Sequence, residues 1–159
     1  YFSGKEEILE LILDRSQAEA ERAVDEAQQM VVEAAADSQP VALFVKVYRR
    51  YAESIDAIRR YTLLAYQEAK SLAPKSRTPL FERERRIAAV LKAAAEPGIR
   101  AGVFTRDALD LRIHSVIVLA HAWAFRHWAW TEYPTIQDYL ADLEKIAVAI
   151  LSNPRPSRR

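Results

Sequence analysis

The sequence is poor in several residue types, and each shortage excludes a class of protein. It has no cysteine, so disulfides and thiolate metal sites are excluded and a reducing cytoplasm is a compatible location. It has only 3 glycines in 159 residues and lacks both a Gly-rich phosphate loop and a nucleophile elbow, so we expect no enzyme activity and no cofactor. No apolar run is long enough to cross a bilayer, no signal peptide is visible, and we expect no membrane partner. The net charge of +1 gives no chain-wide electrostatic reason to bind nucleic acid.

Hydrophobic residues, by contrast, make up 50% of the chain beside 28% charged residues, a balance typical of a folded globular domain. The length is sufficient for a core that needs no disulfide or metal. Helical spacing of the apolar residues continues along the whole chain, which predicts the all-α class, as an antiparallel helical bundle of about six helices. We expect one domain over residues 1–151 and a disordered basic tail over residues 152–159.

Residues 107–131 form the stretch around which the rest of the chain is organised. They contain no glycine or proline and are apolar on two roughly opposite sides of a helix. One stripe is expected to face the chain's own core: Leu109, Ile113, Val116, Ile117, Ala120 and Ala124. The other needs a second layer, for which a second copy of the chain is the natural source: Leu111, Val118, Ala122, Phe125 and Ala129.

The first half of the chain predicts two or three helices. Ser3 and Glu6 form a capping box that starts a long helix reaching about residue 34. Ser38 and Pro40 then fit the start of another, with Ser38 as its N-cap. The spacing leaves open whether residues 52–60 are a kink, a short loop or unbroken helix.

The second half begins with a predicted loop over residues 72–79, after which Thr78 caps a helix that has Pro79 in its first turn. Pro97 is expected to kink or end that helix, and Gly102 fits a left-handed helix cap. A last helix follows residue 135, where Thr135 and Asp138 form a capping box.

Two motifs resemble signatures of TetR-type (TetR/AcrR) transcriptional regulators. The first nine residues are similar to a YF-x-S-K-E-E-L-L pattern, with matches at Tyr1, Phe2, Ser3, Lys5, Glu6, Glu7 and Leu9 and variants at Gly4 and Ile8. Residues 98–104, GIRAGVF, followed by Asp107, are similar to a G-I-x-x-G-x-F segment that lies before the eighth helix of that family. The resemblance implies that the chain is the C-terminal ligand-binding and dimerisation domain, beginning at the fourth helix. In that family the helix-turn-helix lies before the first motif, so we expect operator DNA to be bound through a domain preceding Tyr1.

The resemblance also implies a homodimer in which the central and last helices of each subunit form a four-helix bundle. On this sequence the interface would comprise Leu111, His114, Val118, His121, Ala122, Phe125, Ala129, Leu143, Ile146 and Ile150. The effector pocket would lie among the helices that start near Ser3, Pro40, Tyr61, Thr78 and Asp107.

Aromatic residues beside small and polar ones are the candidates for lining that pocket. Trp123 and His127 lie four residues apart and share a helix face with two alanines, which leave room beside the rings. The candidate ligand-binding residues are Tyr61, Leu64, Tyr66, Glu68, Ile87, Leu91, Ala120, Trp123, Ala124 and His127. They favour a small apolar or aromatic effector. Aromatics in this density are most often core, so a filled core is the competing interpretation.

The three histidines do not indicate a metal site. His114, His121 and His127 are separated by seven and six residues on one helix, whereas two ligands that bind one ion from the same helix lie three or four residues apart. The sequence therefore predicts a ligand-responsive repressor, with a helical dimeric scaffold or partner-binding module as the alternative. An enzyme depending on Glu68 or His127 is a distant third.

Overall fold

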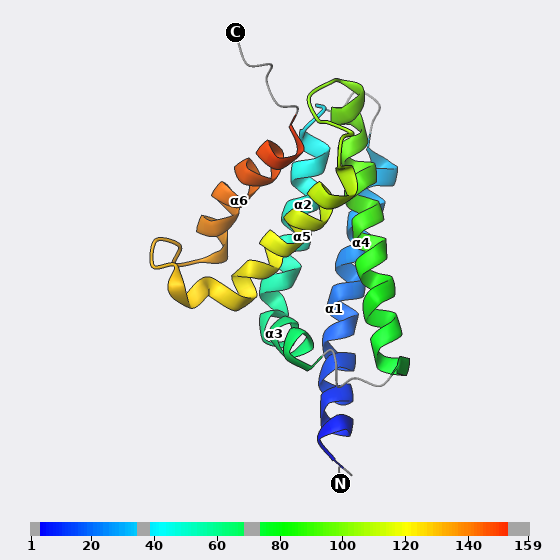
Figure 1. Ribbon diagram of the computed structural model, residues 1–159, viewed down its shortest axis with the longest axis vertical. Helices are drawn as coiled ribbons and strands as arrows, with labels where there is room; N and C mark the ends of the chain where they lie inside the picture. The colour runs from blue at the N-terminus through cyan, green and yellow to red at the C-terminus, as the bar shows by residue number, and fades with distance from the viewer. Residues whose placement is uncertain (1–3, 35–38, 69–73, 153–159) are drawn as a thin grey trace.

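The computed structural model describes residues 4–34, 39–68 and 74–152 (Figure 1). The ordered elements are α1 Lys5–Glu33, α2 Ala42–Ala57, α3 Arg59–Glu68, α4 Pro74–Arg100, α5 Leu109–Arg126, the short 3-10 helix η1 His127–Ala129, and α6 Ile136–Leu151. No strand is present among the described residues, which contain only an isolated bridge between Phe104 and Ser152. The predicted all-α bundle of about six helices is confirmed.

The helices form two connected groups around α2 and α5. Figure 1 shows α1 and α4 side by side along the long axis, and both contact α2. On the other side, α6 packs against α2 and α5, while α3 contacts α1, α2 and α5. None of the described helices combines the length and the apolar content needed to cross a bilayer.

Helix α1 packs through small residues. Ala20, Ala23, Val24 and Ala27 are buried, and their short side chains allow α1 to approach α2 and α4 closely. The predicted capping box at Ser3 and the predicted N-cap at Ser38 lie outside the described residues.

The open question over residues 52–60 has a simple answer. A single residue, Ile58, separates α2 from α3, with φ −111° and ψ 19°. Its N–H donates to the Ser54 carbonyl, while its own carbonyl accepts from the N–H groups of Tyr61 and Thr62 at 2.9 Å each. The backbone therefore changes direction with its hydrogen bonds kept, and Ile58 itself is buried.

Helix α4 corrects the prediction of a loop over residues 72–79. The helix begins at Pro74, so Thr78 is inside it, and the Thr78 hydroxyl donates to the Pro74 carbonyl at 3.0 Å. Pro74 is the proline that suits the first turn, whereas Pro79 removes only one hydrogen bond, to the carbonyl of residue 75. Residues 72 and 73 lie outside the described part of the chain.

The end of α4 excludes one of the two outcomes expected at Pro97. The helix does not end at Pro97 but continues to Arg100, and the Ala101 N–H donates to the Pro97 carbonyl at 3.0 Å. Because Pro97 has no N–H, the carbonyl of residue 93 loses its helical hydrogen bond. Residue 93 is exposed, so water can replace that bond. Gly102 then adopts the predicted left-handed conformation with φ 72°.

Helix α5 is shorter than the predicted 107–131. It starts after Ala108, whose φ of 48° is left-handed, and it tightens into η1 after Arg126. The first predicted stripe is confirmed as core, because Ile113, Val116, Ile117, Ala120 and Ala124 are all buried. In the second stripe Leu111 and Val118 are 69% and 55% exposed in the single chain.

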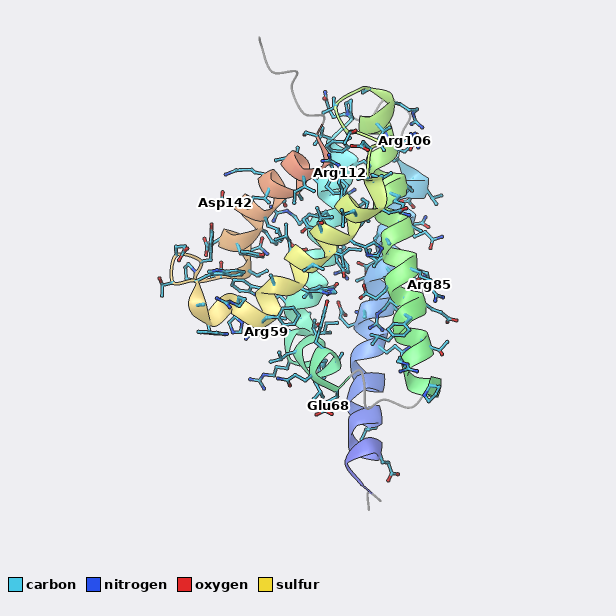
Figure 2. The ribbon with its side chains drawn as sticks, in the orientation of Figure 1. Arg59, Glu68, Arg85, Arg106, Arg112 and Asp142 are labelled. Atoms are coloured by element: carbon cyan, nitrogen blue, oxygen red, sulfur yellow. The ribbon has the colours of Figure 1, made fainter. Side chains whose placement is uncertain are left out.

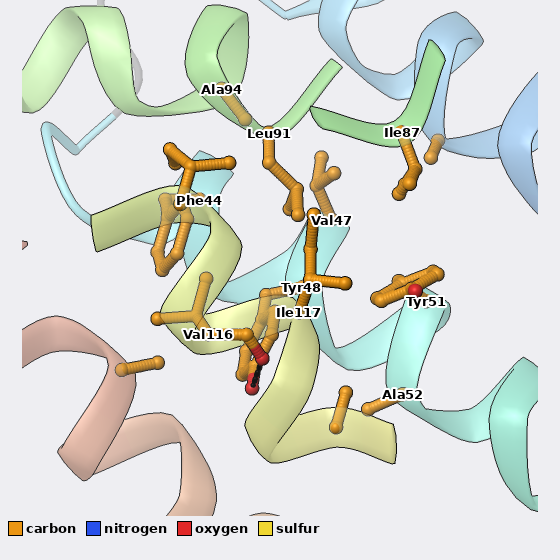
Figure 3. Packing of buried hydrophobic residues seen from close by; sticks show 14 of the residues in the cluster. Phe44, Val47, Tyr48, Tyr51, Ala52, Ile87, Leu91, Ala94, Val116 and Ile117 are labelled. Atoms are coloured by element: carbon orange, nitrogen blue, oxygen red, sulfur yellow. Dashed lines mark hydrogen bonds between the residues drawn. The ribbon is translucent and has the colours of Figure 1, made fainter. Parts of the chain in front are cut away.

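The core sits where α2, α4 and α5 meet, as Figure 3 shows for Phe44, Tyr48, Leu91 and Val116. The buried Tyr48 hydroxyl donates to the Val116 carbonyl at 2.7 Å, so this polar atom is satisfied inside the core.

Helix α6 closes the far side of the core. Its predicted capping box is confirmed, with Thr135 and Asp138 bonded reciprocally. It buries the apolar side chains Tyr139, Leu140, Leu143, Ala147 and Leu151.

Candidate ligand site

A cavity of about 270 Å³ lies among α1, α2, α3, α4 and α5. These are the five helices among which the sequence placed the pocket. Most of its wall is apolar, and the lining side chains are Gln17, Ala20, Val24, Tyr51, Ser54, Ile55, Ile58, Tyr61, Thr62, Ala65, Tyr66, Leu80, Phe81, Arg83, Glu84, Ile87 and His121. Figure 3 shows two of them, Tyr51 and Ile87, where α2 and α4 face one another beside the core.

A hydrogen-bonded triad of side chains forms one part of this wall. The Tyr51 hydroxyl lies 2.6 Å from Nε2 of His121, and the Tyr66 hydroxyl lies 2.7 Å from Nδ1 of the same ring. Tyr51 comes from α2, Tyr66 from α3 and His121 from α5, so the triad connects three helices. Tyr66 is held further by edge-on packing against the rings of His121 and Phe125.

Burial sets the charge of the triad. Because the imidazole is removed from water, and because Arg83 adds a positive charge nearby, the pKa of His121 is lowered to about 4. Burial raises the pKa of both Tyr51 and Tyr66, and the carboxylate of Glu84 adds to each shift. At neutral pH the triad is therefore two phenols and a neutral imidazole.

Two charged residues of α4, Arg83 and Glu84, add to the polar lining, which also includes Gln17, Ser54 and Thr62. Burial raises the pKa of Glu84, against the opposing influence of Arg83 and His114. Arg83 forms no ion pair with any carboxylate of the described residues. In contrast, Arg85, two residues after Arg83 on α4, points away from the bundle (Figure 2).

The cavity contains three of the predicted ligand-binding residues: Tyr61, Tyr66 and Ile87. The other seven do not line it: Leu64, Glu68, Leu91, Ala120, Trp123, Ala124 and His127. Leu91, Ala120 and Ala124 are buried in the core. Glu68 is the last residue of α3, at the end of the bundle (Figure 2).

Trp123 is the main correction to the predicted site. Its Nε1 donates to Oδ1 of Asp56 at 2.7 Å, and its ring stacks on Tyr139 with centroids 5.2 Å apart. His127 lies against this indole and bonds through Nδ1 to the Trp123 carbonyl. The indole of Trp123 therefore contacts both α2 and α6, and it lies on roughly the opposite side of α5 from the cavity-lining His121.

Two residues predicted at the dimer interface lie inside the chain instead. His121 is 3% exposed and lines the cavity, and Leu143 is 1% exposed and faces the core. Of the other eight, Leu111, His114, Val118, Ala129 and Ile146 are exposed, while Ala122, Phe125 and Ile150 are partly buried.

The sequence interpretation missed Tyr51, Arg83 and Glu84, and it misplaced His121. A signal for His121 was present, because it lies four and eight residues after the buried Ile117 and Ile113 and so shares their face. Tyr51 stands in an apolar stripe that spacing alone assigns to the core. Within the described residues no cluster of three or more His, Asp or Glu side chains is placed to hold a metal ion.

Comparison with known proteins supports one fold. The chain superimposes on the crystal structure of the TetR family transcriptional regulator PfmR from Thermus thermophilus with a TM-score of 0.70, over 99% of this chain and 79% of that one, at 21% identity. The chain has the fold of a TetR family regulator. The family resemblance recognised in the two sequence motifs is thereby confirmed for the fold.

A second comparison agrees at the level of sequence. The chain is 27% identical, over 147 residues, to the HTH-type transcriptional regulator HbdR of Aromatoleum sp. (strain CIB), which covers 89% of this chain. The chain spans 59% of that relative's length. No family model matches the chain. Both similar proteins are named as transcriptional regulators.

Proposed function

We propose that this chain is the effector-binding and dimerisation domain of a cytoplasmic TetR-type repressor that leaves its operator when a small apolar or aromatic molecule enters the cavity. The observation that carries this proposal is the cavity itself, which lies at the meeting point of five helices in a regulator's fold. A partly apolar space with a few convergent polar groups is the usual form of a small-molecule site.

Helix α1 provides the route by which a ligand alters DNA binding. Gln17, Ala20 and Val24 place this helix in the cavity wall. The family resemblance implies that the segment leading into α1 comes from the helix-turn-helix. A ligand that displaces α1 therefore changes the separation of the two recognition helices in a dimer, which must match half-sites about 34–36 Å apart.

The size of the effect is limited by differential affinity. A ligand shifts the equilibrium between DNA-competent and splayed forms only by the difference in its binding free energy to the two, commonly about 1–3 kcal/mol. We expect a loss of operator affinity of about 5-fold to 150-fold on saturation with ligand.

The proposed dimer uses the exposed face of α5 and α6. Leu111, Val118 and Ile146 are 69%, 55% and 49% exposed, although they are large aliphatic side chains. Covering them with the same face of a second copy forms a symmetric interface, with four helices packed together. The second apolar stripe of α5 is then covered by the partner subunit.

The test uses the natural full-length protein. Operator sequences are selected from random DNA duplexes, and compounds that raise the melting temperature of the protein are then titrated into the operator complex. We expect such compounds to release the DNA. Ala20→Leu, which fills the cavity from α1, should abolish the response, whereas Ala18→Leu adds the same atoms on the exposed side of α1 and should preserve it.

Two results would contradict the proposal. If no DNA sequence is selected, the regulator assignment fails, and the helical partner-binding module becomes the better interpretation. If compounds bind but the operator affinity stays constant, the cavity is a binding site without the proposed coupling.

A further inference from the structure

The triad in the cavity wall has more hydrogen-bond donors than it can use. Tyr51 and Tyr66 each bring one hydroxyl hydrogen, and the neutral ring of His121 brings one N–H, which makes three donors for two hydrogen bonds. If Nδ1 carries the proton, the ring donates to Tyr66 and accepts from Tyr51, and the Tyr66 hydrogen remains. If Nε2 carries it, the Tyr51 hydrogen remains.

The surplus does not depend on the charge of the ring. A protonated imidazole would donate to both phenol oxygens, which leaves two hydroxyl hydrogens instead of one. Neither hydroxyl has a second acceptor among the described residues, since the only bonds of both atoms are those to His121. Every state of the triad therefore presents an unused O–H donor at a wall of the cavity.

We propose that this cavity selects an uncharged ligand with a carbonyl oxygen on an otherwise apolar, preferably aromatic, frame, and that the spare hydroxyl of the Tyr51–His121–Tyr66 triad donates to that oxygen. The inference deepens the proposed function and rests on it. Tyr51 is 5% exposed, so its spare hydrogen lacks an acceptor inside the protein, and a ligand that supplies one gains over a ligand that does not. Tyr66 is 54% exposed, so its spare hydrogen also has access to water, and the gain is largest when Tyr51 is the donor.

The charges around the cavity favour a neutral carbonyl over a carboxylate or an ammonium group. Arg83 and Glu84 are adjacent in the wall, and their formal charges cancel. The triad is neutral as well, and a charged group entering a largely apolar space loses its hydration. One donor is matched by one acceptor oxygen, whereas a carboxylate has about four lone-pair sites to satisfy.

Three rigid tricycles test the selection, because they differ at a single bridging position. Fluorene has a methylene group there, 9-fluorenone a carbonyl and carbazole an N–H. Their dissociation constants for the full-length protein are measured by calorimetry, together with 9-fluorenone-4-carboxylate as the charged ketone. We expect fluorenone to bind about fivefold to tenfold more tightly than fluorene or carbazole, which is the contribution of one neutral hydrogen bond.

Substitutions then locate the preference. In the double variant Tyr51→Phe, Tyr66→Phe, the imidazole offers both a bare nitrogen and an N–H, so carbazole gains an acceptor and the preference of fluorenone over carbazole should fall to within about twofold. Tyr133→Phe is the matched control, because it also removes a hydrogen-bonded hydroxyl but does not line the cavity. Its ratio of dissociation constants should equal that of the wild type.

A measurement on the unaltered protein covers the case of a double variant that does not fold. The 13C resonance of the fluorenone carbonyl should move downfield on binding, as it does from an alkane to an alcohol. An alkane-like resonance would overturn the inference, and so would equal affinities of fluorenone and fluorene. In both results the compounds bind, so the proposed ligand cavity stands. If none of the tricycles binds, the inference fails and the ligand cavity of the proposed function is contradicted too.

Discussion

Removing the indole N–H of Trp123 should cost stability without changing the affinity of the cavity for ligand. Nε1 of Trp123 donates to Oδ1 of Asp56 at 2.7 Å, and the indole is 4% exposed. This bond ties α5 to the end of α2, directly before the break at Ile58. We therefore expect Trp123→Phe to weaken the attachment of α5 to the α2–α3 corner.

The magnitude follows from the partners. A hydrogen bond to a charged acceptor contributes about 1.5–3 kcal/mol. Asp56 also accepts from Nη1 of Arg59 at 3.0 Å, but the Arg59 side chain is 43% exposed, so that ion pair contributes at most about 1 kcal/mol. The phenyl ring keeps part of the stacking on Tyr139, which adds a further loss that is unrelated to Asp56.

A double-mutant cycle isolates the bond. Trp123→Phe, Asp56→Ala and the combined variant are compared by urea unfolding, and we expect a coupling free energy of about 1.5–3 kcal/mol between the two sites. Asp56→Asn keeps an acceptor oxygen and should lose less than Asp56→Ala. A coupling below about 0.5 kcal/mol would refute the argument, as would a Trp123→Phe protein of normal stability that no longer binds fluorenone.

Three further predictions concern other parts of the fold. Gly98→Ala should destabilise the protein by about 1–3 kcal/mol in urea unfolding, because its Cβ would overlap the buried Phe104 ring. The Cβ of Gly102→Ala meets open space, so this variant should lose only the roughly 1–2 kcal/mol that a left-handed conformation costs a residue with a Cβ. As the pH falls from 6.5 to about 4, His121 should lower the free energy of unfolding by up to about 3 kcal/mol, because the unfolded ring binds a proton in that window and the buried ring does not. This part of the pH dependence should vanish in His121→Gln. Val118→Lys should shift the protein from dimer to monomer in analytical ultracentrifugation, and a wild-type protein that is already monomeric contradicts the interface.

The fold was predictable because local and periodic signals agree in most of this chain. The buried stripe of α5 and the capping box of Thr135 and Asp138 followed from spacing and cap chemistry alone. The errors in the helix bounds fell at the ends of α5 and at two prolines. Sequence rules treat Pro79 and Pro97 as boundaries, yet a helix tolerates both where the lost hydrogen bond belongs to its first turn or to an exposed carbonyl.

The position of the cavity was predictable only to the level of helices. The pocket lies among the five helices named from the sequence, but only three of the ten predicted ligand-binding residues line it. The aromatic density of residues 123–130 drew attention to one side of α5, where Trp123 and Trp130 together with Tyr139 form a stacked core. The cavity lies on the other side of α5, and its hydroxyl groups come from α2 and α3. Residue spacing along the sequence does not determine which faces of α2 and α3 are turned toward α5.

Helix α1 is suited to pass a small displacement from the cavity to its own N-terminal end. Its cavity-lining segment is held laterally by ion pairs of Arg50 with Glu19 and Glu26 on α2's side, and of Arg86 with Glu21 on α4's side. Partly exposed pairs of this kind each contribute about 0–1 kcal/mol, so they resist tilting weakly. The distance along the helix from residue 20 to residue 5 is about 22 Å at 1.5 Å per residue, and a tilt of about 5° there moves the end by about 2 Å. In the proposed mechanism, a ligand that binds the tilted form more tightly by a few kcal/mol is able to overcome these pairs, and the length of α1 amplifies the movement at its N-terminal end.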